Sequence, residues 1–512
     1  MSTEIATPHA TRESTVTSAL DLVLTLLSIV VPLVFTTRMR SFAAAKLTLL
    51  EIGVGIALVL AGFATRQRMA PLQVAGFGTA VLALTLLARP DPEGLAAVGG
   101  FVALSGFAVL FAMRSPHWSD RRILAIVAIP LAVGITCCAA QAFGVAVLDA
   151  TVRSFGGTHG TIVGTIGNPV ENAWWLVLGV VLLHGLAPRR AAWITAVLVA
   201  LIVLDSRSRA TAAVGGLAVV LALAWHGTAW ARVAAVVVLL AAGLAFVEWG
   251  GVEALRGRWF LLGVGADMLR DAALVPQGGG AFARDFPAAQ QAALAVSPTL
   301  APFASVLDHA HCDLLELAYE LGLPGIAGLG WIGHAVVVAW RRDPSPRRRG
   351  AVWTLAVGVA LGVFGYPLFS PACAMTLAIA IGLALAPSVA AASMPSPQRT
   401  APSRPMLWSR ALGSLGWVAV GGCLVVLGTR QAAAELAMTS ALASHDDGDD
   451  TAGRSHAQRA VALFASADAW FYLGNFELAH GDLELAAAAY RRSLALRPRA
   501  QAAANLRRAG GR

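Results

Sequence analysis

Apolar runs of membrane-spanning length alternate with short polar stretches along most of the chain. Runs of roughly 16–25 apolar residues can cross a hydrocarbon core of about 30 Å as helices. The pattern therefore predicts an all-α, polytopic transmembrane helix bundle of about 13 spans. The first run lacks a small-residue cleavage site and is long enough to span, so we expect a retained helix. The expected spans are 18–36, 43–63, 71–88, 94–113, 122–148, 171–187, 190–205, 210–225, 230–248, 317–340, 351–369, 372–390 and 406–428.

One long segment, residues 249–316, interrupts this series and carries arginines, histidines and a glycine triplet. It separates an N-terminal group of expected spans, residues 1–248, from a C-terminal group, residues 317–428. Residues 429–512 lack long apolar runs, and we expect them to form a water-exposed helical tail.

The tail contains the spacing of one tetratricopeptide repeat, a helix-turn-helix unit of about 34 residues. A single repeat cannot bury its apolar face alone, so a neighbouring unit is required. Residues 457–464 are expected to belong to a degenerate preceding repeat, and residues 500–508 to a capping helix. The residues that match the repeat are Trp470, Leu473, Gly474, Ala486, Tyr490 and Pro498.

Composition supports a membrane protein and excludes several other classes. Of 512 residues, 57% are hydrophobic and 13% charged, and the mean hydropathy is +0.69. Soluble domains carry about 25% charged residues. The net charge of +9 fits basic cytoplasmic loops, and no nucleic-acid-binding motif is present. The five cysteines have neither disulfide-framework nor zinc-site spacing.

Arginines in the short loops predict which helix ends share a side of the membrane. The strongest cluster, residues 341–349, is placed in the cytoplasm. Counting spans then puts the 249–316 segment and the tail outside, with Arg38 and Arg40 breaking the rule. The other stretches expected on the cytoplasmic side are 66–68, 114–122 and 189–190.

His311 lies where the long outer segment meets the next span. If residues 312–321 form a helix, Asp313 and Glu316 lie on other faces of it than His311, and the His309 side chain points in a different direction from that of His311. A neutral imidazole at this boundary can accept a proton from a hydroxyl nucleophile. His311 can also be an interfacial histidine that only forms local hydrogen bonds, and the residue taken alone favours this second interpretation.

Four arginines are candidates for binding an anion. Arg207 and Arg209 lie between two apolar runs, either in a solvated turn or with one of them facing inward to bind phosphate. Arg256 and Arg258 open the long segment and offer the same chemistry. The paired aspartates are confined to the tail turn, residues 446–450, which favours a metal-independent mechanism without cofactors. No phosphate-binding loop or dinucleotide fingerprint is present.

Glycine, proline and asparagine mark three further places. Gly278 and Gly280 let backbone N–H groups approach an anion, although a glycine triplet is more often a flexible turn. Gly322 and Pro324 are expected to break or kink the helix before the next span. Asn168 belongs to an outer-face turn before a span and is a candidate to line the site.

These elements, in this order, resemble the O-antigen ligase and O-antigen polymerase superfamily, which includes bacterial protein O-oligosaccharyltransferases. The resemblance covers about residues 160–340, and its last motif is the most specific. The motif stretches are Gly164–Pro169, Ser208–Ala210, Arg258 with Gly278–Phe282, and His311–Gly325.

The sequence departs from the family pattern at several positions. Ile166 stands where the family has Phe, Val170 where it has Asn, and Cys312 where Asn is usual. The family's tryptophan after the loop arginine is displaced. A competing alignment of the Ser-Arg motif falls on Ser206–Arg207.

The resemblance implies a glycosyltransferase in the bacterial inner membrane, with its site and tail in the periplasm. The implied donor is a glycan on polyprenyl pyrophosphate, and the implied acceptor is a hydroxyl of lipid A-core, a glycan or a protein. Arg209 and Arg258, with Arg207 and Arg256, would neutralise the pyrophosphate. His311 would take or orient the acceptor proton. Ligase activity in lipopolysaccharide or surface-polysaccharide biosynthesis is the first expectation, and polymerase and protein-glycosylation activities, which share these motifs, are the alternatives.

Two other classes of protein remain as alternatives. A transporter for lipid-linked sugars would carry ionisable residues along a midplane pathway and internal repeats, whereas here the charges gather at the outer boundary. A membrane-tethered scaffold would act through its tail alone and leave the outer segment without a role. In any of these classes, the tail is a candidate to bind an envelope protein.

Overall fold

The computed structural model describes residues 8–36, 39, 42–64, 72–145, 163–187, 251–305, 307–387 and 404–510. All regular secondary structure in these ranges is helical. Arg207, Arg209 and the predicted spans 190–205, 210–225 and 230–248 lie outside them. The helices of the membrane part are α1 (Pro8–Leu33), α2 (Phe42–Phe63), α3 (Leu72–Ala88), α4 (Pro92–Arg114), α5 (Asp120–Ala142), α7 (Pro169–His184), α13 (Asp313–Arg342), α14 (Pro346–Phe364), α15 (Pro371–Leu385) and α17 (Arg404–Asp446).

Membrane-length helices make up much of this bundle. Within the described ranges, six helices are long and apolar enough to cross a membrane. They belong to α1, α2, α4, α5, α13 and α17, and α3, α7 and α15 are shorter apolar helices. Every predicted span from 18–36 to 171–187, and from 317–340 to 406–428, falls on a helix. The all-α class predicted from the hydrophobic pattern is therefore confirmed for the described residues, and six of their helices are candidates to span a membrane.

Close packing of helix backbones fixes α17 against α2. An added Cβ at Gly55 would lie 2.6 Å from the Gly421 carbonyl oxygen, so the two helices touch where both lack side chains. α17 then continues without a break past residue 429, the predicted start of the tail. The tail is thus joined to the bundle through one continuous helix of 43 residues rather than through a flexible linker.

Loops that the arginine pattern assigned to one side meet at one end of the bundle. Gly185, after α7, packs against Gly350 of α14, where an added Cβ would lie 2.5 Å from the Gly350 Cα. Arg347, at the start of α14, forms an ion pair with Asp120, at the start of α5. The candidate chemistry lies at the opposite end, with the α3–α4 connection and the start of α13.

The segment expected as a long loop is itself mostly helical. It contains α11 (Gly251–Asp271), α12 (Ala281–Val296) and a short 3-10 helix, Pro298–Phe303. Phe260, Phe282 and Phe286 form the centre of a separate apolar cluster between α11 and α12. This cluster makes the segment a small lobe, called here the α11–α12 lobe, that packs on the first turns of α13.

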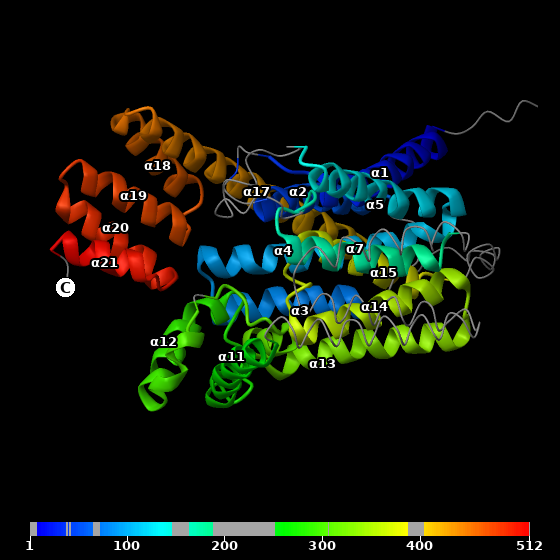
Figure 1. The fold of residues 1–512 in the computed structure, drawn as a ribbon. Helices are drawn as coiled ribbons and strands as arrows, with labels where there is room; N and C mark the ends of the chain where they lie inside the picture. The colour runs from blue at the N-terminus through cyan, green and yellow to red at the C-terminus, as the bar shows by residue number, and fades with distance from the viewer. Residues whose placement is uncertain are drawn as a thin grey trace, which may run out of the picture.

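The tail continues from α17 as four short helices beside the same end of the bundle (Figure 1). Gly474 allows the ring of Tyr490 to pack directly on the backbone, since an added Cβ would lie 2.7 Å from that ring. The two helices that carry the predicted repeat residues thus pack against each other. The tail helices are α18 (Asp450–Leu463), α19 (Ala467–Ala479), α20 (Leu483–Leu496) and α21 (Ala500–Arg508).

Candidate functional site

The stretch that begins at His311 starts as irregular backbone and continues as α13. α13 starts at Asp313, and the expected break occurs at Gly322, which adopts φ 61° and ψ −161°. The Leu323 amide donates to the Leu274 carbonyl at 3.0 Å, so the chain after α11 packs into this break. The start of α13 is thereby fixed against the α11–α12 lobe.

His309 is held by a buried carboxylate and by aromatic rings. Its Nδ1 lies 2.9 Å from Glu316 Oε1, and the Ala310 amide donates to Glu316 Oε2 at 2.7 Å. The imidazole stacks on Tyr366 with ring centroids 4.9 Å apart and contacts Phe369 at 4.8 Å. These contacts leave the ring little freedom to rotate.

His311 meets the same tyrosine from another direction. Its ring packs edge-on against Tyr366 at 5.1 Å, and its backbone adopts φ 52°, a left-handed conformation that is strained for histidine. The expectation that His309 points in a different direction from His311 is therefore wrong, since both imidazoles contact Tyr366. Both histidines precede α13, so helical spacing does not apply to them. Burial, and then the charges of Arg258 and His309, lower the pKa of His311 to about 4.

Arg258 joins the histidines from α11. Its charge acts on His311 and on Tyr366, and burial lowers the pKa of its guanidinium from the usual value. Arg256 lies two positions earlier on α11 and is exposed. The structure therefore brings Arg258, His309 and His311 around Tyr366, and distinguishes Arg258 from its exposed neighbour.

Asp313 connects this cluster to the connection between α14 and α15. Its backbone amide donates to the Gly365 carbonyl at 3.2 Å, and its Oδ2 accepts from the Leu368 amide at 3.1 Å. The side chain is 2% exposed. Asp313 thus holds in place the connection that carries Tyr366 and Phe369.

The turn before α7 reaches the cluster through Glu171 rather than through Asn168. Asn168 caps α7, because its side-chain oxygen accepts from the Val170 amide at 2.9 Å and the Glu171 amide at 3.3 Å. The Glu171 carboxyl interacts electrostatically with His309 and Tyr366. Asn168 therefore sets the position of Glu171 beside the imidazole.

Lys46 anchors the same turn from within α2. It is 1% exposed, and its Nζ donates to the Thr165 carbonyl at 3.0 Å and to the Val34 carbonyl. Glu171 also interacts with its charge. Sequence reasoning missed Lys46 and Glu171, although ionisable residues in or beside apolar segments are themselves a signal of function.

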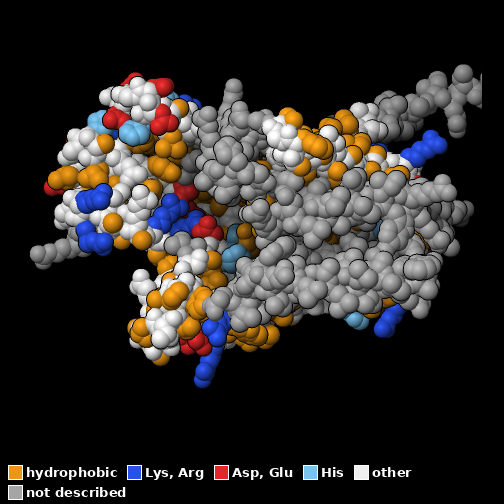
Figure 2. All heavy atoms as spheres, in the orientation of Figure 1, with side chains coloured by type: hydrophobic (Ala, Val, Ile, Leu, Met, Phe, Trp, Pro, Cys, Tyr) orange, Lys and Arg blue, Asp and Glu red, His pale blue; other side chains and the backbone are white. Residues whose placement is uncertain are grey.

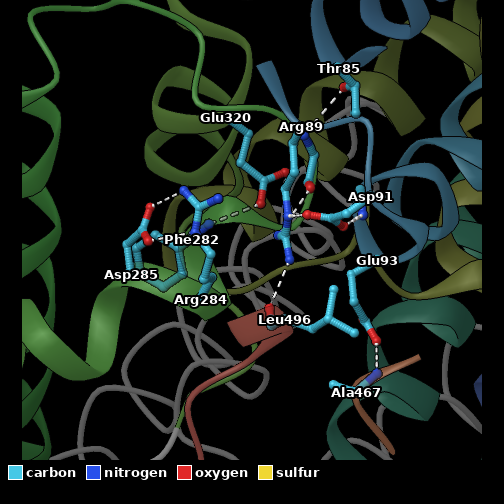
Figure 3. Close-up of polar contacts among 12 residues, drawn as sticks. Thr85, Arg89, Asp91, Glu93, Phe282, Arg284, Asp285, Glu320, Ala467 and Leu496 are labelled. Atoms are coloured by element: carbon cyan, nitrogen blue, oxygen red, sulfur yellow. Dashed lines mark hydrogen bonds and ion pairs between the residues drawn. The ribbon is translucent and has the colours of Figure 1, made fainter. Parts of the chain in front are cut away.

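Gly278 and Gly280 lie against α13 and the α3–α4 connection. The Gly278 amide donates to the Glu320 backbone carbonyl at 2.9 Å, and the Gly279 amide donates to Thr85 Oγ1 at 3.2 Å. The glycine triplet thus uses these donors to dock the lobe (Figure 3). An added Cβ at Gly278 would lie 2.6 Å from Arg89, so close packing explains this glycine.

Arg89, at the end of α3, connects the lobe with the tail. Its guanidinium is 3% exposed, pairs with Asp91 at 2.8 Å, and donates to the carbonyls of Gly279 at 3.4 Å and Leu496 at 2.9 Å (Figure 3). Arg497 of the tail forms an ion pair with Asp308, the residue before His309. The turn after α20 therefore lies next to the histidine segment.

The tail and the α11–α12 lobe border a hollow at this end of the molecule (Figure 2). Basic, acidic and histidine side chains gather at its inner end, where the tail meets the bundle. The described residues include no group of three or more His, Cys, Asp or Glu side chains placed to hold a metal ion. The cluster around Tyr366 combines one guanidinium, two imidazoles and buried carboxylates.

No protein-family model matches the chain, and neither does any curated protein.

Proposed function

We propose that this protein is an O-antigen ligase-like glycosyltransferase that transfers a glycan from a polyprenyl-pyrophosphate donor to an acceptor hydroxyl. The observation that supports it is the meeting of Arg258, His309 and His311 around Tyr366, beside the turn that ends at Asn168. Of these residues, Asn168, Arg258 and His311 come from motif stretches that lie far apart in the sequence, and each stretch resembles the same superfamily.

The reaction requires neutralisation of the negative charge on the leaving pyrophosphate and removal of the proton from the acceptor hydroxyl. A guanidinium binds phosphate oxygens with two parallel hydrogen bonds, so Arg258 would bind the pyrophosphate and stabilise it as it leaves. Binding that anion would also offset the positive charge that lowers the pKa of His311. Direct attack by the acceptor hydroxyl would invert the anomeric carbon.

The proposed setting is the bacterial inner membrane, with about 13 spans and the site on the periplasmic face. The apolar surface of the bundle would accommodate the lipid part of the donor. Arg207 or Arg209 would add a second cation to the pyrophosphate site. The helices α19 and α20 would form the tetratricopeptide repeat, which would bind an envelope protein in the same assembly pathway.

Transfer of glycan to acceptor, measured with purified protein in lipid nanodiscs and a lipid-linked donor, tests this proposal. We expect Arg258→Ala and His311→Ala each to lower the transfer rate by roughly 100-fold or more. Arg270→Ala is the matched control, because Arg270 is an exposed arginine at the other end of the same helix. Wild-type rates in both site variants would show that these residues do not form the active site.

A transporter for lipid-linked glycans is the second candidate, and one observation favours it. Glu51 of α2 is fully buried, and neither carboxyl oxygen has a hydrogen-bond partner among the described residues. A buried ionisable residue within a span is typical of a transport pathway. Movement of labelled lipid-linked glycan across vesicle membranes, abolished by Glu51→Gln without any glycan transfer, would favour the transporter.

A further inference from the structure

Two histidines share the site, but their surroundings differ. The carboxylate of Glu316 can only accept hydrogen bonds, so the Nδ1 of His309, 2.9 Å away, must carry the proton. This bond fixes the ring tautomer and leaves Nε2 as the nitrogen with a free lone pair. Within the described residues, Nε2 makes no hydrogen bond.

The Glu316 carboxylate is well placed to orient His309. Its side chain is 2% exposed, whereas 32% of the His309 side chain is exposed. One carboxylate oxygen accepts a hydrogen bond from the imidazole and the other accepts one from the Ala310 amide, so both oxygens have a partner. Tyr366 and Phe369 pack on the ring and restrict it to the plane set by this bond. A buried, fully bonded carboxylate behind a partly exposed imidazole orients a proton acceptor.

The charges around His309 also favour its role as a proton acceptor. Burial lowers the pKa of His309, but the charge and hydrogen bond of Glu316, with the charges of Glu320 and Glu171, outweigh burial and raise it. In the part of the chain that the structure describes, no carboxylate forms a hydrogen bond with the His311 imidazole. Burial and the charge of Arg258 lower its pKa to about 4, which makes its lone pair a weak base.

We propose that His309, oriented by Glu316, is the catalytic group that takes the proton of the acceptor hydroxyl, while His311 helps Arg258 to position the donor. This inference rests on the proposed function. The acceptor oxygen forms a bond to the anomeric carbon as the bond from that carbon to the pyrophosphate oxygen breaks. The electron pair leaves with the pyrophosphate, and the acceptor proton moves to His309 Nε2.

The groups that face His309 come from every element around it. They are Glu316, Glu320 and Asp313 from α13, Glu171 from α7, Tyr366 from the α14–α15 connection, and His311 with the nearby Arg258. Glu316 is the one that bonds directly to the imidazole. Removing its charge therefore changes the basicity of His309 more than the removal of a more distant carboxylate.

The test is the pH profile of glycan transfer for wild type, His309→Gln and Glu316→Gln in nanodiscs. His309→Gln is expected to lower turnover by roughly 10²- to 10⁴-fold, with little effect on binding of the donor. Glu316→Gln is expected to cause a smaller loss and to move the acidic limb of the profile to lower pH. A purely structural role of Glu316 would lower the rate without moving that limb.

Donor binding and thermal melting of each variant separate misfolding from loss of the base. If folded His309→Gln transfers glycan at the wild-type rate while Arg258→Ala does not, the His309 inference is overturned and the glycosyltransferase proposal stands. If wild type transfers no glycan to any acceptor class, the glycosyltransferase proposal fails and the inference fails with it. An acidic limb near pH 4 that Glu316→Gln leaves in place would identify His311 as the base instead.

Discussion

Replacing Arg89 by alanine is expected to loosen the tail from the bundle. The change removes the guanidinium that donates to Leu496 of the tail at 2.9 Å and to Gly279 of the lobe at 3.4 Å. A hydrogen bond to a charged group contributes roughly 1.5–3 kcal/mol, so loss of the Leu496 bond raises local opening of the tail roughly 10- to 150-fold. Glu93 still accepts from the Ala467 amide at 2.6 Å, so the tail loosens without detaching.

Hydrogen exchange of peptides covering residues 483–508 measures this opening in the intact protein. Arg114→Ala is the matched control, because Arg114 is also a buried arginine paired with an aspartate, Asp21, but does not contact the tail. Faster exchange is expected in Arg89→Ala alone. The same exchange rates in Arg89→Ala and wild type would refute the conclusion that this arginine holds the tail.

Three further predictions concern the break in α13, the turn before α7 and the pH dependence of stability. Gly322→Ala is expected to destabilise the protein by roughly 1–3 kcal/mol, because its φ is 61° and a Cβ would overlap the Leu274 carbonyl; Gly333→Ala, with open space around it, is not expected to lower the melting temperature. Lys46→Met is expected to speed hydrogen exchange in residues 163–170, because the Thr165 carbonyl loses its donor; unchanged exchange there would show that Lys46 does not hold the turn. Between about pH 4 and 6.5, the folded protein binds fewer protons at His311 than the unfolded chain does, because the pKa of His311 is lowered in the folded state. The melting temperature is therefore expected to decrease as the pH is lowered from about 6.5 to 4, and to decrease less in His311→Asn.

The hydrophobic pattern predicted the helices of the described membrane part well. Run length reports directly on the thickness of the bilayer, so segments such as 94–113 and 317–340 fall on α4 and α13. The same pattern could not show that α17 continues from the membrane into the tail. Nor could it show the packing of Gly55 against Gly421, because this is a contact between distant parts of the sequence.

The candidate site was predicted in part. Arg258 and His311 meet as the motif stretches predicted, and the kink at Gly322 was read from the sequence. Helical spacing misplaced His309 because His309 lies in the irregular segment before α13. Tyr366 gave no signal, since one tyrosine in a connection between two apolar helices acquires its role only through tertiary contacts.

Binding of the pyrophosphate headgroup tests the central claim most directly, because it does not require the acceptor to be known. Affinity for polyprenyl pyrophosphate would be compared in wild type, Arg258→Ala and the exposed-arginine control Arg270→Ala, with polyprenyl alcohol as the ligand that lacks phosphate. We expect Arg258→Ala to bind polyprenyl pyrophosphate at least about tenfold more weakly, and Arg270→Ala to bind it like wild type. Equal binding of polyprenyl pyrophosphate by wild type and Arg258→Ala, or no preference of wild type for the pyrophosphate over the alcohol, would contradict the account.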